Sequence, residues 1–546
     1  MPSLLTHVLP SGHPLLQDRP RVYIVHLLPP ESGRMLSGSE EVLEAWYKSF
    51  LPTPSLDCGK PRMVHSYTEV ISGFAAWLTP REVEDMRAMD GFVGAQPDEP
   101  LTLDTTHTPT FLQLENGTGL WGSTKWGEGR LIGVIDFNID PDHVSFAGVG
   151  MKPRPHWNGT CDFRCTSPAT CSCTNKLLGA RLFNLQPKAD TDHGTMVASI
   201  AAGDFVAGAK DYKFLNYAKG NASGVSPKSY LSFYSAKVSN KFLAAIEQAI
   251  RDRVDVLSIS QSLDTPAYHS NDLAIGTLRA VEKGIFVAMS AGNTGPRPMS
   301  VRNNAPWLLT VGASTHDRAL EMILNTTDTA TGVRKVHYGA TQFDLDAIFT
   351  SNQRLVYPAG DGRGGHNVKT CNNTLGHEKN VQGAIRYNFT KRGAVKARFW
   401  PSKPVFNIRP CPVVAGFSSR GPSKEITGFL KPDILGPGVS ILAARSGSRD
   451  EFKTVSGTSF ATPHLAAIAA LLKSRHPDWS PAAIRSAIMT TADIHGTRIT
   501  NHTGKTASLY DMGAGLVNPT RADDPGLVYN ITDTSVSSAV CTHSVR

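Results

Sequence analysis

The pattern of apolar and polar positions predicts a small first domain over residues 21–104, after an unstructured segment of residues 1–20. Its elements are expected as strand, helix, strand, strand, helix and strand, in Val22–Leu27, Ser39–Phe50, two runs within Val64–Leu78, Pro80–Met89 and Gly91–Pro97. This order is typical of a ferredoxin-like α+β module.

A longer domain is expected over residues 105–520, because short apolar runs alternate there with helical segments. The expected strands are Leu131–Ile135, Leu231–Tyr234, Val254–Ser260, Ile285–Met289 and Leu308–Val311. The expected helices are Gly194–Ala202, Phe242–Arg251, Leu273–Lys283 and Ser459–Lys473. Such alternation predicts an α/β fold, with a parallel sheet between two layers of helices. The pattern lapses into a polar, glycine-rich stretch at about 321–412, and residues 521–546 form a tail.

A serine stands where the second domain's last long helix begins. Ser459 follows Gly457 and precedes the alanine-rich run Ala461–Lys473. The unpaired N–H groups and the positive end of the helix dipole favour a developing negative charge at this position. We expect Gly457 to permit a turn that a residue with a side chain would resist. Ser459 is therefore a candidate nucleophile, although a helix cap is the commoner role of such a serine.

A serine hydroxyl is a poor nucleophile until a base takes its proton, and a third group must orient that base. Asp136 ends the apolar strand at Leu131–Ile135, which predicts a carboxylate at the carboxyl edge of the sheet. His193 opens the next helix, in the run Asp-His-Gly-Thr. Asn293 follows the apolar strand at Ile285–Met289 and is a candidate donor to an oxyanion, together with the N–H of Ser459.

These four segments resemble those of the subtilisin-like serine proteases, in the chain order Asp, His, Ser. In that family the acid lies in V-I-D, the base in H-G-T, the oxyanion asparagine in A-G-N and the nucleophile in G-T-S, as they do here. The plant branch is indicated by further runs, at Phe417–Pro422, Leu430–Ile434, His476–Pro481 and Pro525–Tyr529.

The resemblance implies the fold and chemistry of a serine endopeptidase. It implies a three-layer core, an acyl-enzyme made by Asp136, His193 and Ser459, and no metal or organic cofactor. It also implies that Ser260, Gln261 and Ser262 pair with the backbone of a polypeptide substrate. The stretch at about 321–412 matches the position of a protease-associated domain but is shorter, and we expect the family's terminal fibronectin-III-like domain to be absent.

The first domain then resembles the family's propeptide, which assists folding and inhibits the active site from within the same chain. The segment Asp104–Pro109 resembles the maturation junction, so self-cleavage is expected just after Asp104, and an ordinary linker is the alternative. Threonines and a proline favour the extended conformation in which a cleft binds a peptide.

Several residues depart from the plant pattern. Asp192 and Ser262 stand where the family has glycine, Met196 replaces a histidine, and Ala467 replaces a glycine. A second hypothesis is therefore an inactive relative that binds peptides or a protein partner. A third, a hydrolase of esters or lipids, is disfavoured because no Gly-x-Ser-x-Gly elbow surrounds Ser459.

Composition narrows the class of protein. With 40% hydrophobic and 19% charged residues, the 546-residue chain is expected to be globular and to contain several domains. The formal charge of +8 is spread along the sequence without a basic helix or RNA-binding motif, which argues against nucleic acid. No apolar run has the length of a membrane span, so no membrane partner is expected either.

Cysteines and glycosylation sequons favour an extracellular protein. Cys161, Cys165, Cys171 and Cys173 lie in one polar loop, with one or two disulfides favoured over a zinc site because the spacings do not match paired zinc ligands. The family pattern suggests the pair Cys161–Cys173, and leaves Cys371 unpaired or joined to Cys411. Sequons begin at Asn116, Asn158, Asn221, Asn325, Asn372, Asn388, Asn501 and Asn530.

Secretion to the apoplast or cell wall is thus expected, although residues 1–20 lack the apolar core of a signal peptide. A missing true start is favoured over an unusual export route.

Overall fold

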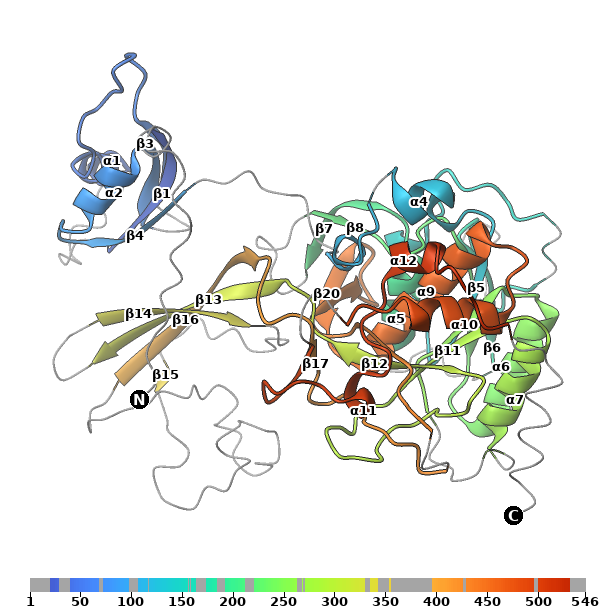
Figure 1. Ribbon diagram of the computed structural model, residues 1–546. Helices are drawn as coiled ribbons and strands as arrows, with labels where there is room; N and C mark the ends of the chain where they lie inside the picture. The colour runs from blue at the N-terminus through green and yellow to red at the C-terminus, as the bar shows by residue number, and fades with distance from the viewer. Residues whose placement is uncertain are drawn as a thin grey trace. The chain divides into compact units, whose positions relative to one another are not determined.

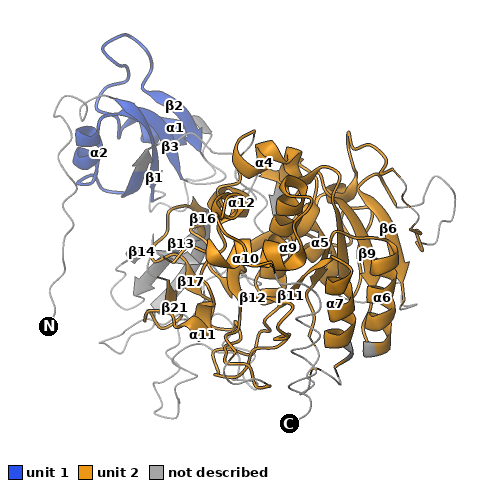
Figure 2. Cartoon of the chain, turned by 45° about the vertical axis from the view of Figure 1, so that its right-hand side comes forward, with its two compact units in different colours: residues 1–102 blue, residues 103–546 orange. Residues whose placement is uncertain are grey.

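The computed structural model divides the chain into two compact units, residues 1–102 and 103–546 (Figures 1 and 2). The structure describes residues 20–28, 40–67, 72–97, 107–115, 117–155, 157, 159–163, 173–183, 192–211, 220–262, 268, 271–328, 334–341, 353–354, 395–425, 429–494 and 499–530. The expected cleavage site at Asp104, both chain ends, Cys165, Cys171, Cys371 and the sequons at Asn116, Asn158, Asn372 and Asn388 lie outside these ranges.

The first unit has the expected ferredoxin-like element order. Its elements are β1 (Arg21–Leu27), α1 (Glu40–Lys48), β2 (Met63–Tyr67), β3 (Gly73–Leu78), α2 (Pro80–Met86) and β4 (Phe92–Pro97). The strands pair in the order β2-β3-β1-β4. Every second residue of β1, namely Tyr23, Val25 and Leu27, is buried in the core, as expected for a sheet with one covered face. Thr79 and Glu82 form a reciprocal cap at the start of α2.

A largely parallel sheet forms the centre of the second unit, and the predicted α/β fold is confirmed. Among the described residues its strands follow the order β21-β17-β12-β11-β10-β5-β9-β6, with β18 paired to β12. Their bounds are β5 Leu131–Asp136, β6 Leu177–Leu182, β9 Tyr230–Ser235, β10 Val256–Ile259, β11 Phe286–Ser290, β12 Leu309–Ser314, β17 Val413–Val414, β18 Ile434–Pro437 and β21 Thr500–Asn501. Pairing is parallel from β6 through β12.

Helices cover both faces of this sheet, as the alternation of its side chains requires. Ile132 and Val134 of β5 pack in one core with α5 (His193–Ala202) and α9 (Thr458–Arg475). Leu131 and Ile135 pack in a second core with α6 (Ser239–Arg251) and α7 (Asp272–Glu282), which lie side by side in Figure 2. Strands buried on both faces give the continuous apolar runs seen in the sequence.

Helix α9 lies inside the second unit, with every residue from Thr458 to Leu472 buried. Its apolar residues do not form a single stripe, and a helix that is apolar all round needs neighbours on every side. The neighbours of α9 are α5, the sheet, and the smaller helices α4 (Gly119–Ser123), α10 (Pro481–Thr490) and α12 (Pro519–Asp523).

Two smaller sheets complete the second unit. One has the order β19-β20-β7-β8, formed by Ile441–Ala444, Glu451–Val455, Val206–Asp211 and Gly220–Ala222. The other has the order β14-β13-β16-β15, formed by Arg334–Thr341, Ala319–Asp328, Val395–Val405 and Gln353–Arg354. The second sheet falls in the stretch where the sequence predicted no regular element. Its strands carry Glu, Asn, Lys and Asp, which are uncommon in strands and obscured the pattern.

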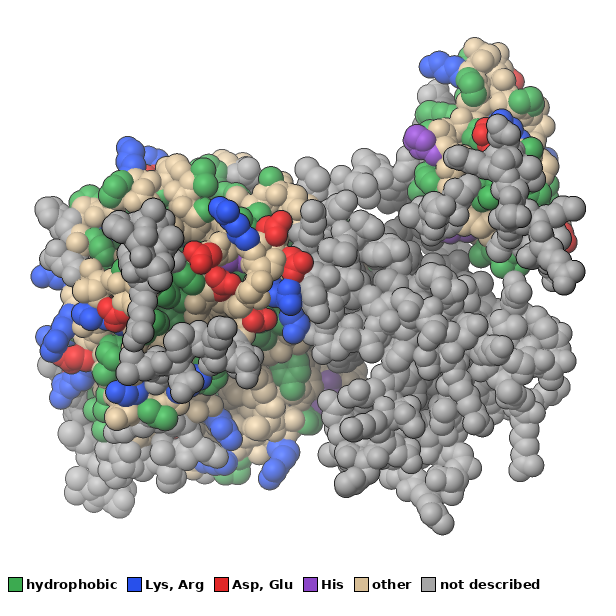
Figure 3. Space-filling model, turned by 180° about the vertical axis from the view of Figure 1, so that it is seen from behind, with side chains coloured by type: hydrophobic (Ala, Val, Ile, Leu, Met, Phe, Trp, Pro, Cys, Tyr) green, Lys and Arg blue, Asp and Glu red, His purple; other side chains and the backbone are tan. Residues whose placement is uncertain are grey.

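Short helical turns complete the described elements: α3 at Thr108–Phe111, α11 at Leu509–Met512, and two 3-10 turns at Lys125–Gly127 and Val144–Phe146. In the described ranges no helix combines the length and the apolar character that crossing a bilayer needs. On the face drawn in Figure 3, described acidic and basic side chains are intermixed, so the positive net charge is not gathered there into one basic surface.

The expected disulfide Cys161–Cys173 is present, while Cys58 and the buried Cys411 are free. Burial raises the pKa of the Cys411 thiol to about 12, so this thiol stays protonated and unreactive at neutral pH.

The burial of α9 gives a first testable prediction. Leu465 is fully buried beside Gly436, where an added Cβ would come within 2.5 Å of its Cδ2 atom. We expect Leu465→Ala to lower the free energy of unfolding by about 2–5 kcal/mol, because it leaves a cavity that close packing cannot fill. Denaturant unfolding measures this. Leu527→Ala is the control, since Leu527 is 89% exposed; equal losses in the two variants would contradict the placement of α9.

Candidate active site

Asp136 is the last residue of β5 and is completely buried. Its Oδ1 atom accepts a hydrogen bond from the backbone N–H of Phe137 at 2.7 Å. Both carboxylate oxygens lie near Nδ1 of His193, at 2.8 and 3.0 Å. The predicted acid and base, 57 residues apart in sequence, are therefore in direct contact.

His193 is the first residue of α5, and its side chain is one-quarter exposed. With Nδ1–H donating to Asp136, Nε2 carries a lone pair and has no hydrogen-bond partner among the described residues. Burial alone lowers the pKa of His193, but the charge of Asp136 and its hydrogen bond outweigh this and raise the pKa above its ordinary 6.5. Asp136 thus orients the imidazole and stabilises its protonated form.

Lack of space explains why a glycine, Gly194, follows His193. A Cβ at Gly194 would lie 2.1 Å from the carbonyl oxygen of Asn138 and 2.7 Å from the ring of Phe233. Only glycine allows the first turn of α5 to approach the segment after β5 this closely. The contact between His193 and Asp136 depends on that approach.

Ser459 is the second residue of α9, so its N–H is one of the four that have no acceptor within the helix. Its hydroxyl donates to the carbonyl oxygen of Ser260 at 3.1 Å, and among the described residues no hydrogen bond joins it to His193. The neighbouring ring of Phe460 lies 5.4 Å from the imidazole, measured between centroids. The start of α9 is therefore beside His193, with the hydroxyl turned toward Ser260.

The expected reason for Gly457 is wrong. Its φ of 163° is extended backbone that any residue adopts. A Cβ there would instead lie 3.3 Å from the ring of Phe460 and 3.6 Å from Nδ2 of Asn293. A Cβ would therefore need only a small shift of the Phe460 ring, and neither the backbone angle nor the space requires a glycine here.

Asn293 follows β11 and its amide is oriented by α9. Its Oδ1 atom accepts from the backbone N–H of Thr458 at 2.9 Å and from the Thr458 hydroxyl at 2.8 Å. Because the oxygen is held by these two donors, the amide nitrogen remains as the donor on the other side of the group. Thr458 is a residue whose part the sequence reading missed, although it lies in the Gly-Thr-Ser run.

Ser260, the residue after β10, makes two hydrogen bonds with Ser459. Its hydroxyl donates to the carbonyl oxygen of Ser459 at 2.8 Å, and its own carbonyl accepts from the Ser459 hydroxyl. Pro463 explains the first bond. A proline has no N–H for the carbonyl four residues earlier in a helix, which here is that of Ser459. The Ser260 hydroxyl supplies the missing donor.

The other two predicted substrate-binding residues continue from Ser260. The carbonyl of Gln261 accepts from Nδ2 of Asn303 at 2.8 Å, and the same nitrogen donates to the carbonyl of Ser290 at 2.9 Å. Asn303 thus ties the segment after β10 to the end of β11, a link that the sequence did not suggest. Ser262 is partly buried.

The sequence profile of the subtilase family matches residues 127–515. The chain belongs to the subtilase family. The profile of the peptidase inhibitor I9 family matches residues 22–104.

Three plant relatives are similar over most of the chain. Subtilisin-like protease SBT1.4 of Arabidopsis thaliana is 34% identical, over 97% of this chain and 78% of its own length. Subtilisin-like protease SBT1.6 of the same plant is 35% identical, over 88% and 74%. Subtilisin-like protease SBT3 of Solanum lycopersicum is 33% identical, over 88% and 73%. The predicted class, a subtilisin-like serine-type endopeptidase with an inhibitory propeptide domain, is confirmed.

The departures from the subtilase pattern fit the fold. Met196 is 5% exposed and belongs to the core around α9, and Ala467 is fully buried there. Asp192 precedes α5 and makes no side-chain cap bond. Among the described residues, no hydrogen bond joins the side chain of any of the three to Asp136 or to the His193 ring.

The Ser260 hydroxyl donates to the Ser459 carbonyl in place of the N–H that Pro463 lacks, and this gives a second prediction. We expect Ser260→Ala to lower the free energy of unfolding by about 1–3 kcal/mol, because the buried carbonyl of Ser459 loses its donor. The loss should be smaller in a Pro463→Ala background, where a backbone N–H is restored at position 463.

A double-mutant cycle of the two substitutions, followed by denaturant unfolding, measures the coupling free energy. An equal effect of Ser260→Ala in both backgrounds would show that the hydroxyl does not replace the missing helical donor.

Proposed function

We propose that Asp136, His193 and Ser459 form the catalytic triad of this subtilase, with Asn293 and the N–H of Ser459 as the oxyanion hole. The observation that carries the proposal is the hydrogen bond between His193 Nδ1 and the buried Asp136, beside the amino end of α9. It supplies an oriented base with a free Nε2 lone pair next to a serine at a helix start.

The mechanism is peptide hydrolysis through an acyl-enzyme. The Ser459 oxygen attacks the substrate carbonyl while its proton passes to His193 Nε2, and the new oxyanion receives hydrogen bonds from Asn293 and the Ser459 N–H. The C–N bond then breaks, and the protonated His193 gives its proton to the leaving amine. A water, deprotonated by the same imidazole, attacks the acyl-enzyme and releases the acid product and Ser459.

One side-chain rotation is needed before the attack. The Ser459 hydroxyl now donates to the Ser260 carbonyl, and turning about its Cα–Cβ bond redirects it toward His193. Catalytic hydrogen bonds are often long or misaligned before substrate binds. A substrate strand that pairs with residues 260–262 would compete for the same carbonyl and favour the rotation.

The first unit supports the proposal that the chain is made as a zymogen. Its match to the I9 inhibitor family supports a propeptide that inhibits the peptidase of the same chain. We propose that self-cleavage after Asp104 separates the two, and that the protein is secreted as a glycoprotein. The sequon residues Asn221 and Asn530 are exposed, so their side chains are accessible to glycan transfer.

Labelling and processing test the proposal. A fluorophosphonate probe should label the protein at Ser459, because only an activated serine reacts readily with such a reagent. The purified protein should begin near Thr105, and the Ser459→Ala variant should keep its first unit. Mass spectrometry and amino-terminal sequencing read both results. A protein that neither labels nor processes would support the inactive, peptide-binding alternative.

The pH dependence of activity gives a separate prediction. Neutral His193 is the base, so kcat/KM should fall as the pH drops through the pKa of His193 in the free enzyme. Because that pKa is raised, the acidic limb should lie above pH 6.5. Asp136→Asn removes both pKa-raising contributions and leaves burial, which lowers the pKa. The limb should therefore move to lower pH, and kcat should fall about 10⁴-fold.

Asp192→Asn is the matched control, since Asp192 is the adjacent acid and makes no cap bond. Its acidic limb should remain in place. A shift of equal size in both variants would contradict a specific pairing of Asp136 with His193.

A further inference from the structure

The side-chain amide of Asn303 joins two segments of the candidate active site. Its Nδ2 atom donates to the carbonyl of Gln261 at 2.8 Å and to the carbonyl of Ser290 at 2.9 Å. Both partners are acceptors only, and an amide nitrogen carries two hydrogens, so the nitrogen rather than the oxygen of the amide faces them. Both N–H groups are therefore used, one on the segment after β10 and one on the end of β11.

The bond to Gln261 holds the segment that continues beyond Ser260. Ser260 itself is bonded to Ser459 through its hydroxyl and through its carbonyl. One residue later, the carbonyl accepts from Asn303 instead. Among the described residues, no other hydrogen bond reaches the backbone of Gln261 or Ser262. Asn303 thus fixes the part of the proposed substrate-binding segment that Ser459 does not hold.

The proposed oxyanion donor is held by a different set of bonds. Oδ1 of Asn293 accepts two hydrogen bonds from the start of α9, so the orientation of this amide does not depend on Asn303. The turn before it is also bonded elsewhere, because the carbonyl of Gly292 accepts from the N–H of Ser419 at 2.9 Å. Removal of the Asn303 amide should therefore disturb residues 261–262 more than it disturbs Asn293.

The backbone at position 303 favours an asparagine. Its φ is 50°, in the left-handed region, where glycine is unstrained and asparagine is tolerated better than most other residues. Asparagine adds what glycine lacks, a short side chain with two N–H donors. The substitution Asn303→Gly thus removes the bridge between the two carbonyls and leaves the backbone conformation allowed.

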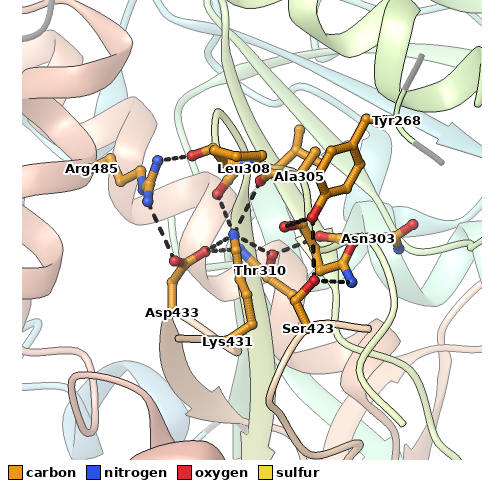
Figure 4. A network of polar contacts seen from close by, with 11 residues as sticks. Tyr268, Asn303, Ala305, Leu308, Thr310, Ser423, Lys431, Asp433 and Arg485 are labelled. Carbon is orange, nitrogen blue, oxygen red and sulfur yellow. Dashed lines mark hydrogen bonds and ion pairs between the residues drawn. The ribbon is translucent and has the colours of Figure 1, made fainter. Parts of the chain in front are cut away.

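A buried network holds the backbone of Asn303 in place (Figure 4). The carbonyl of Asn303 accepts from the Thr310 hydroxyl at 2.7 Å, and that hydroxyl accepts from Nζ of Lys431 at 2.8 Å. An ammonium group has no acceptor, which fixes the direction of this chain of bonds. Lys431 also donates to Asp433 at 2.6 Å, and both side chains are buried. Because its backbone is fixed in this way, the Asn303 amide is held in position before a substrate binds.

We infer that Asn303 is a positioning residue for the substrate. By holding the Gln261 carbonyl, it keeps residues 260–262 in the form that pairs with an extended peptide. The inference rests on the proposed function, since it needs a substrate that lies along this segment. A segment that is already in place binds a peptide without the cost of ordering it. Loss of the bridge should therefore weaken the binding of peptides and have less effect on the chemical step at Ser459.

Kinetics with two substrates test the inference. One is a peptide that spans a bond cut by the wild-type enzyme in denatured casein. The other is p-nitrophenyl acetate, which is too small to pair along residues 260–262. In Asn303→Gly we expect KM for the peptide to rise about tenfold to hundredfold, as a misplaced binding group predicts. The kcat for the peptide and the rate with the ester should each change by less than about threefold, because the lost interaction is one of binding. Rates are expressed per Ser459 labelled by the fluorophosphonate.

A second variant, Asn303→Asp, keeps the shape of the side chain. An ionised carboxylate accepts hydrogen bonds and donates none, so it would face the carbonyls of Gln261 and Ser290 with oxygen alone. The KM for the peptide should rise at least as far as in Asn303→Gly. Asn407→Gly is the matched control, because Asn407 has the same left-handed backbone, with a φ of 58°, but is exposed. Its kinetic constants should equal those of the wild type.

The inference and the proposed function fail in different ways. An unaltered KM for the peptide in both Asn303 variants, in enzyme that labels at Ser459, would overturn the positioning role alone. Equal losses toward the peptide and the ester would also overturn it, because they indicate a general disturbance of the fold. A wild-type protein that cuts no bond in casein would overturn the proposed function, and the inference with it.

Discussion

Parallel pairing of β5, β10 and β11 is the constraint on which the site depends. Parallel strands all end at the same edge of a sheet, so the residues that follow them converge whatever their distance in sequence. Asp136 ends β5, Ser260 follows β10, and Asn293 lies just beyond β11. The first turns of α5 and α9 add His193 and Ser459, the proposed base and nucleophile, at this edge.

The start of α9 joins these strand ends to one another through its own unpaired backbone groups. Thr458 binds Asn293, and Ser459 exchanges hydrogen bonds with Ser260. The first pairing uses an N–H that every helix leaves free at its start. The second uses a carbonyl that is free only because Pro463 follows four residues later. The helix is thus fixed to two strand ends by groups that its own hydrogen-bond ladder does not use.

The sequence predicted much of this arrangement because each candidate catalytic residue lies at the boundary of a strongly apolar element. Asp136, His193, Asn293 and Ser459 could be found that way, and the three-layer core follows from the same runs. The sequence could not predict contacts between residues that are distant along the chain, such as the hydrogen bond from Asn303 to the Gln261 carbonyl. It also gave the wrong reason for Gly457, because a glycine in a sequence does not show which backbone angles it adopts. The antiparallel sheet of β13 to β16 was missed because propensity is a weak guide where polar residues form strands.

Thr108, near the start of the second unit, is hydrogen-bonded to α9, the helix that carries Ser459. This bond bears on which part of the chain processing would change. The Thr108 hydroxyl lies 2.9 Å from Nε2 of His464, and Nδ1 of His464 lies 2.8 Å from the carbonyl of Phe460. Burial lowers the pKa of His464 to about 4, against a smaller opposing effect of the Phe460 bond. The ring is then neutral at ordinary pH, with Nδ1–H as donor and Nε2 as acceptor of the Thr108 proton.

A neutral, fully buried imidazole in one tautomer makes this attachment insensitive to pH across the range in which His193 titrates. A cut after Asp104 would fall only four residues before Thr108, which is hydrogen-bonded to His464 of α9. The segment that follows the cut would then keep its hydrogen bond to the nucleophile's helix, and the change on processing would fall on the first unit. The attachment of Thr108 thus keeps the residues after the proposed cut with the second unit.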